Sequence, residues 1–154
     1  MAAEGVEGRA TIHIQAPPEK VYAMISDVTR MGEWSPETHT CEWIEGATGP
    51  AVGARFKGSN KRGIMRWSTK PTVKVADPGK AFTFEVGTPG KEDTRWSYTL
   101  TPKDGGTELT ESFEALRYIL IFKIISPPKR RNRQLQEGVE KTLERIKRAA
   151  EGIA

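Results

Sequence analysis

A carboxyl group on an apolar strand face is the feature of this sequence best placed to do chemistry. The stretch TRWSYTLTPKDGGTELTESFE, residues 94–114, alternates as two strands around a turn that contains two glycines. Side chains alternate between the two faces of a strand, so Glu111 shares a face with Leu109 and Phe113. If that face is buried, the carboxyl group must be paired, protonated or hydrated.

A turn centred on residues 103–106 predicts which residues of the two strands face each other. Tyr98 is then opposite Glu111, and Trp96 is opposite Phe113. The other face carries pairs that suit a solvent-exposed ladder: Arg95–Glu114, Ser97–Ser112 and Thr99–Thr110. Tyr98 and Glu111 are therefore predicted to meet on the inner face of the sheet.

Two interpretations of Glu111 remain open. The carboxyl group could hydrogen-bond to Tyr98, or to a basic residue of the C-terminal helix, for purely structural reasons. It could instead line a cavity, where burial raises the pKa of a carboxyl group and suits it to orienting a ligand or moving protons.

Aromatic residues of the neighbouring predicted strands could line the same space. Trp67 is expected to share a face with Met65, and Phe56 is expected to share one with Asn60. Rows of rings are common in an ordinary core, but rings combined with one or two polar groups also suit a flat or aliphatic ligand. The expected ligand-binding residues are Phe56, Asn60, Met65, Trp67, Phe84, Trp96, Tyr98, Glu111 and Phe113, with His39 at the mouth of the pocket.

Few other residues suggest chemistry. His39 has the same strand parity as Cys41 and Trp43, and an ordinary histidine at the pocket mouth is favoured over a catalytic base. No serine or cysteine nucleophile can be given a partner base, so no catalytic residue is assigned. There is no glycine-rich phosphate loop and no Cys/His metal spacing, so we expect no cofactor and no metal.

Composition places the chain among soluble globular proteins. It has 154 residues, 36% of them hydrophobic and 29% charged, and a net charge of +4, which suits one domain with one core. Its single cysteine suits a reducing compartment, and the N-terminus lacks the apolar region of a secretory signal, so we expect a cytoplasmic protein. No apolar run reaches the ~18 residues that a membrane span needs.

The elements that must position these residues follow from periodicity and from turn residues. We expect an opening strand, two short helices, six strands and a long amphipathic helix at residues 9–16, 18–27, 28–37, 39–46, 54–60, 64–76, 80–87, 93–101, 107–115 and 129–152. The apolar stripe of the last helix is Leu135, Val139, Leu143, Ile146, Ala150 and Ile153. This order predicts an α+β fold with a curved seven-stranded antiparallel sheet wrapped around the long C-terminal helix.

Several segments also carry a family resemblance. They are APPEKVYAMISDVTRMGEWSPE, GPAVGARFKGSN, WSYTLTPKDGGTELTES and EGVEKTLERIKRAAE, in that order along the chain. Together they resemble the START-related polyketide cyclase/dehydrase (SRPBCC) superfamily. The resemblance implies a helix-grip fold, with residues 1–154 as a single START-like ligand-binding domain. Because that superfamily holds lipid carriers, hormone receptors, aromatase/cyclases and hydrolases, the fold does not define the activity.

Three functions are compatible with these observations. Binding of a small hydrophobic ligand (a lipid, a polyketide or an aromatic metabolite) is favoured, because only Tyr98 and Glu111 can be placed together and proton transfer needs convergent polar groups. The alternative is a polyketide aromatase/cyclase or dehydratase in which Glu111, Tyr98 or His39 moves protons. The third is a membrane-peripheral interaction domain.

Residues 118–133 carry the membrane hypothesis. A mostly apolar run is followed there by the basic cluster KRRNR, residues 129–133, a combination that could touch an anionic membrane surface. The favoured interpretation is that the run covers the open end of the pocket and that the basic cluster is a solvated helix face. Nucleic-acid binding is not expected, because no recognition module accompanies the cluster. The identity of the ligand and the oligomeric state remain open.

Overall fold

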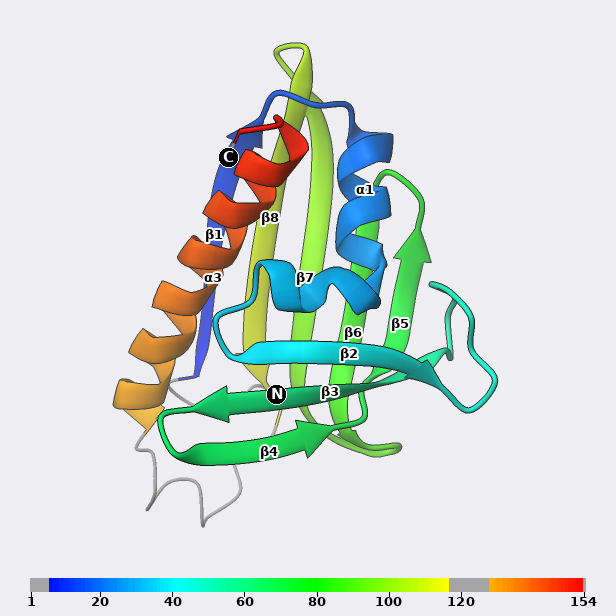
Figure 1. Cartoon of the computed structure of the whole chain (residues 1–154), viewed down its shortest axis with the longest axis vertical. Helices are drawn as coiled ribbons and strands as arrows, with labels where there is room; N and C mark the ends of the chain where they lie inside the picture. The colour runs from blue at the N-terminus through cyan, green and yellow to red at the C-terminus, as the bar shows by residue number, and fades with distance from the viewer. Residues whose placement is uncertain (1–5, 117–127, 154) are drawn as a thin grey trace.

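The computed structural model describes residues 6–116 and 128–153, which form one curved sheet with helices on its inner side (Figure 1). The elements in chain order are β1 (Glu7–Ile14), α1 (Pro18–Ser26), the 3-10 helix η1 (Val28–Glu33), β2 (Thr38–Ile44), β3 (Arg55–Arg62), β4 (Met65–Thr69), β5 (Thr72–Asp77), β6 (Ala81–Thr88), β7 (Lys91–Lys103), β8 (Gly106–Ala115) and α3 (Pro128–Ala150). The α+β helix-grip architecture is as predicted.

The sheet is antiparallel and its main path runs over seven strands. The order is β1-β8-β7-β6-β5-β3-β2, while β4 lies off this path and pairs with β3. The stretch 64–76, expected as one strand, forms β4 and β5 instead. Pro71 lies between them, and a proline cannot donate a hydrogen bond to a strand ladder. The predicted seven-stranded path is thus confirmed, with β4 as an additional strand beside it.

The sheet turns sharply between β5 and β3. The ladder between these two strands contains a single facing pair, Arg55 and Thr72. The strands β2, β3 and β4 therefore leave the direction of β5–β8 and run across the inner side of the sheet (Figure 1). This bend creates a concave interior, because it brings β3 round to face the side of the sheet on which α3 lies.

The helices close the concave side. Figure 1 shows α3 lying along β1, while α1 covers the other part of the sheet. The predicted apolar stripe of α3 is buried at Leu135, Val139, Leu143, Ile146 and Ala150. Ile153, expected to continue the stripe, is 50% exposed because it lies beyond the last helical residue. None of the helices in residues 6–116 and 128–153 is long and apolar enough to cross a lipid bilayer.

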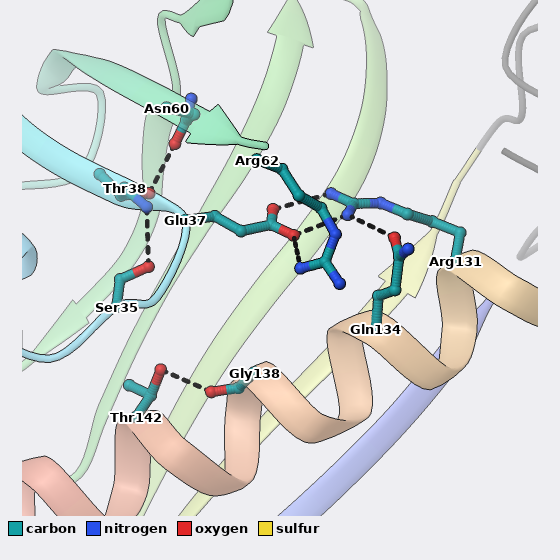
Figure 2. A network of polar contacts seen from close by, with 9 residues as sticks. All are labelled: Ser35, Glu37, Thr38, Asn60, Arg62, Arg131, Gln134, Gly138 and Thr142. Atoms are coloured by element: carbon teal, nitrogen blue, oxygen red, sulfur yellow. Dashed lines mark hydrogen bonds and ion pairs between the residues drawn. The ribbon is translucent and has the colours of Figure 1, made fainter. Parts of the chain in front are cut away.

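A cluster of three charged residues fixes the N-terminal end of α3 (Figure 2). Arg131 donates two hydrogen bonds to the carboxylate of Glu37, at 2.7 and 2.9 Å. Arg62, at the end of β3, approaches the same carboxylate at 3.4 Å. Glu37 directly precedes β2, so the cluster joins three segments that are distant in the sequence. Arg131 therefore departs from the solvated face predicted for the basic cluster.

We expect Arg131→Gln to destabilise the protein by about 1–2 kcal/mol, because a two-point ion pair between half-buried groups is stronger than an exposed one. Arg62→Gln is the matched control. Its side chain is 43% exposed and makes the longer contact, so its loss should cost less than about 0.5 kcal/mol. Urea denaturation followed by circular dichroism measures both values. Equal effects would contradict a dominant role for the Arg131–Glu37 contact.

Candidate functional site

The β7–β8 hairpin places Tyr98 directly opposite Glu111. Each facing pair predicted from the sequence of these two strands is present in the ladder. The register follows from the turn, since Asp104 and Gly105 have φ angles of +50° and +77°. Positive φ at both central residues is typical of a type I′ turn, whose two residues match the natural twist of a hairpin.

Glu111 is a buried acid, and one of its oxygens is left without a partner by the part of the chain that the structure describes. Its side chain is 5% exposed, and its Oε1 has no hydrogen-bond partner among the described residues. Burial raises the pKa of Glu111 to about 8, an effect that a hydrogen bond with the Tyr98 hydroxyl partly opposes. At neutral pH the carboxyl group is therefore mostly protonated, and it can donate one hydrogen bond as well as accept others.

Tyr98 provides a second neutral polar group beside this acid. It is 4% exposed, and burial is the main reason why the pKa of its hydroxyl lies well above the usual value of 10. The nearby charge of ionised Glu111 acts in the same direction. Tyr98 and Glu111 are therefore two neutral polar groups with exchangeable protons that lie among apolar side chains.

A row of aromatic rings begins on one side of this pair. Trp96 and Phe113 face each other in the hairpin, with ring centroids 5.5 Å apart. Phe84 on β6 faces Trp96 across the next ladder. Phe84 also meets Phe56 of β3 edge to face, at a centroid distance of 5.2 Å. The rings thus continue from the hairpin, across the bend of the sheet, to β3.

The strands β3 and β4 add a polar amide and another ring. Asn60 is 8% exposed, and its Oδ1 accepts a hydrogen bond from the Thr38 hydroxyl at 2.6 Å (Figure 2). Its Nδ2 contacts the Gly58 carbonyl oxygen only at 3.5 Å, so this amide nitrogen keeps capacity to donate elsewhere. Trp67 faces Asn60 across the β3–β4 ladder and is partly buried, but it is not among the side chains that pack against the buried core of the described residues.

Met65, expected to line the site, is not brought into the interior, and His39, expected at the mouth of the pocket, lies on the surface. Met65 is 51% exposed, because it lies at the outer end of β4 beside the turn. His39 is exposed, and an irregularity in the β2–β3 ladder between Thr38 and Thr40 interrupts the strand alternation there. A strand bulge of this kind cannot be inferred from side-chain periodicity, so the parity argument fails at His39.

Two surface hollows among the described residues lie outside this interior. One follows the loop of residues 45–55. Another lies on β1, β8 and β7, beside Arg9, Arg95 and Ser112, and of the expected site residues only Phe113 borders it. Support for an interior site therefore comes from the chemistry of its buried side chains.

Sequence reasoning missed the polar contacts next to this interior. Glu37 and Arg131 are 94 positions apart, and Thr38 and Asn60 are 22 apart. Helical and strand periodicities relate residues only within one element or one hairpin. The only available signal was the presence of a basic residue near the start of the last helix, and this did not identify its partner.

Comparison with known proteins agrees with the family resemblance found in the sequence. The family model described as "Polyketide cyclase / dehydrase and lipid transport" matches residues 6–151. The solution structure of the polyketide cyclase-like protein Cgl2372 from Corynebacterium glutamicum is 34% identical, covers 93% of this chain and 90% of that one, and has a TM-score of 0.65. A comparison with curated proteins found no match.

Two further structures share the fold at lower identity. The di-domain ARO/CYC StfQ from the steffimycin biosynthetic pathway is 14% identical, with a TM-score of 0.77 over 96% of this chain and 51% of that one. The protein TTHA0849 from Thermus thermophilus is 21% identical, with a TM-score of 0.70 over 94% and 96% of the two chains. At these identities the likeness concerns the fold alone.

The raised pKa of Glu111 predicts a specific pH dependence of stability. Well below pH 4.5 the carboxyl group is protonated in both the folded and the unfolded state, so it does not make the free energy of unfolding depend on pH. As the pH rises toward about 8, the unfolded state ionises first, so the free energy of unfolding falls, by at most on the order of 5 kcal/mol. Glu111→Gln should remove this part of the pH dependence in urea titrations across that range.

Glu108→Gln is the matched control for this measurement. It lies on the same strand, but its side chain is 36% exposed and pairs with Lys103. Its pH profile should follow that of the unmodified protein. If Glu111→Gln also keeps the original profile, Glu111 does not titrate with a raised pKa.

Proposed function

The chain belongs to the polyketide cyclase/dehydrase and lipid transport family, and on that premise we propose that it binds a small hydrophobic ligand between its curved sheet and α3. The observation that carries the proposal is the buried carboxyl group of Glu111, whose Oε1 has no partner among the described residues. A buried polar atom left unsatisfied costs about 1–3 kcal/mol. A ligand that supplied the missing hydrogen bond would recover that cost.

The surrounding side chains support a particular class of ligand. Rings suit a flat or aliphatic molecule, and the acid of Glu111 with the hydroxyl of Tyr98 suits one carbonyl or hydroxyl group on it. A lipid, a polyketide or an aromatic metabolite meets both requirements. The proposed lining consists of Phe56, Asn60, Trp67, Phe84, Trp96, Tyr98, Glu111 and Phe113.

The same pair favours a second candidate function, a polyketide aromatase/cyclase or dehydratase. General acid–base catalysis works best when the pKa of the catalytic group lies near the working pH, and that of Glu111 is about 8. Glu111 would exchange a proton with the substrate, and Tyr98 would orient the substrate oxygen. The family covers both polyketide cyclases and lipid transport, so membership is compatible with either function.

We expect native mass spectrometry of the purified protein to show a species heavier than the 17.1 kDa chain by the mass of one small molecule, which denaturation releases. Glu111→Leu should weaken binding of the released molecule about tenfold or more, because it removes the buried hydrogen-bonding group. Glu108→Leu, at a partly exposed position on the same strand, should bind normally. Absence of any bound molecule, together with no uptake of anilinonaphthalene sulfonate, would contradict the proposal.

Glu111→Gln separates a carrier from an enzyme. The amide keeps a neutral hydrogen-bonding group, so ligand affinity should stay within a fewfold of the original value. It cannot exchange a proton, so any cyclase or dehydratase turnover should fall by about 10²–10⁴-fold. Turnover that survives this substitution would exclude Glu111 as the acid or base.

A further inference from the structure

The turn between β3 and β4 carries the most exposed large apolar side chain of the described residues. Ile64 is 99% exposed, and its neighbour Met65 is 51% exposed. The remaining exposed large apolar residues in the described ranges, Val52, Val75 and Ile153, are isolated in the sequence. Scattered apolar residues are normal on a surface, but Ile64 and Met65 are adjacent at the tip of a hairpin and form a small exposed apolar patch.

The turn itself does not require an apolar residue. Arg62 faces Met65 in the ladder, so Gly63 and Ile64 form a two-residue loop. Gly63 has a φ of +60°, which is typical of the first central position of a type II′ turn. The second position commonly holds Asn, Ser or Thr, and a fully exposed isoleucine adds nothing to the packing. The fold therefore does not account for Ile64.

Basic residues lie on both strands next to this apolar patch. Lys61 faces Arg66 directly across the ladder, and both are exposed. Like charges at directly opposite positions destabilise a sheet, so this pair also works against the fold. It becomes favourable only when a negatively charged partner lies nearby.

The first turns of α3 extend the basic surface. Lys129, Arg130 and Arg133 are exposed there. The Arg62–Glu37–Arg131 cluster ties this end of α3 to the end of β3, so the β3–β4 turn and the first turn of α3 lie close together (Figures 1 and 2). Among residues 6–116 and 128–153 we find no ion pair for Lys61, Arg66, Lys129, Arg130 or Arg133.

We propose that this surface, made of the β3–β4 tip and the first turns of α3, docks on a lipid bilayer that contains anionic lipids. Ile64 and Met65 enter the region between the headgroups and the acyl chains, while the basic residues meet lipid phosphates and carboxylates. Of the segment 118–133, considered from the sequence for membrane contact, residues 118–127 lie outside the described part of the chain.

A bilayer suits this surface better than an acidic protein does. The apolar part is a narrow protrusion, and a protein partner would need a matching pocket to bury it. A bilayer accepts a protruding side chain without shape complementarity, and its surface potential attracts several separated basic residues at once. This inference concerns the outer surface and does not depend on the interior ligand site.

Vesicle flotation tests the proposal with the full chain. The protein should float with phosphatidylcholine vesicles that contain about 30% phosphatidylserine, but not with phosphatidylcholine alone, and raising the salt concentration should weaken binding. Ile64→Ser should lower partitioning about tenfold or more, because it removes the inserted side chain. Val52→Ser is the matched control, since Val52 is 70% exposed but lies in the loop before β3.

The charges are tested separately. Replacing both Lys61 and Arg66 by Gln should lower partitioning about twenty-five-fold, at roughly fivefold for each charge. Lys141→Gln, at an exposed position farther along α3, should leave partitioning unchanged. Thermal unfolding of each variant checks that the fold is retained.

A label at the tip locates the contact. Burial raises the pKa of the Cys41 thiol to about 12, so Ile64→Cys can be labelled selectively with a polarity-sensitive dye. Its emission should shift to the blue with anionic vesicles, whereas that of a label at Val52→Cys should not. The proposal is overturned if the unmodified protein does not float with anionic vesicles at low salt. It is equally overturned if Ile64→Ser and Val52→Ser partition alike, because the contact then lies elsewhere.

Discussion

The alternation of side chains along the β7–β8 hairpin is the constraint on which the interior of this protein depends. Leu109 and Phe113 are almost completely buried, and Glu111 lies between them on the same face. Turning the carboxyl group out to water would turn both apolar neighbours out as well, since a slip of one residue exchanges the two faces of a strand. The acid is therefore held inside by the burial of its neighbours, and its raised pKa follows from that position.

The strand β3 links this interior to the rest of the molecule. Phe56 joins the row of rings, Asn60 presents its amide beside Trp67, and Arg62 reaches the carboxylate of Glu37. These three residues are separated by even numbers of positions, so their side chains share one face of the strand. Because β3 turns away from β5 after one facing pair, it runs across the inner side of the sheet and ends beside α3 (Figures 1 and 2). One strand thus contributes to the core, to the candidate site and to the anchoring of the helix.

The same strand leads directly to the proposed membrane surface. Asn60 lies inside, while Lys61 and Ile64 lie within four residues of it on the outside. A bilayer at the β3–β4 tip would therefore be only a few residues from the polar amide of the candidate site. The charge cluster of Glu37 holds the end of β3 and the start of α3 together, which is the arrangement that the proposed membrane surface requires. The proposed ligand site would thus lie next to the proposed membrane surface.

Local signals in the sequence were sufficient for the order of the elements, the buried stripe of α3, the β7–β8 register and the inward position of Glu111. Each depends on periodicity within one element or on turn residues such as Asp104 and Gly105. Only the tertiary structure decided four other features. These are the exposed position of His39 at a bulge, the division of residues 64–76 into two strands, the exposure of Met65 at the outer end of β4 and the Glu37–Arg131 contact. The physical reason is that a bulge and a bend re-aim side chains without changing the hydrophobic pattern, and that a contact across 94 positions exists only once the bend has brought β3 to α3.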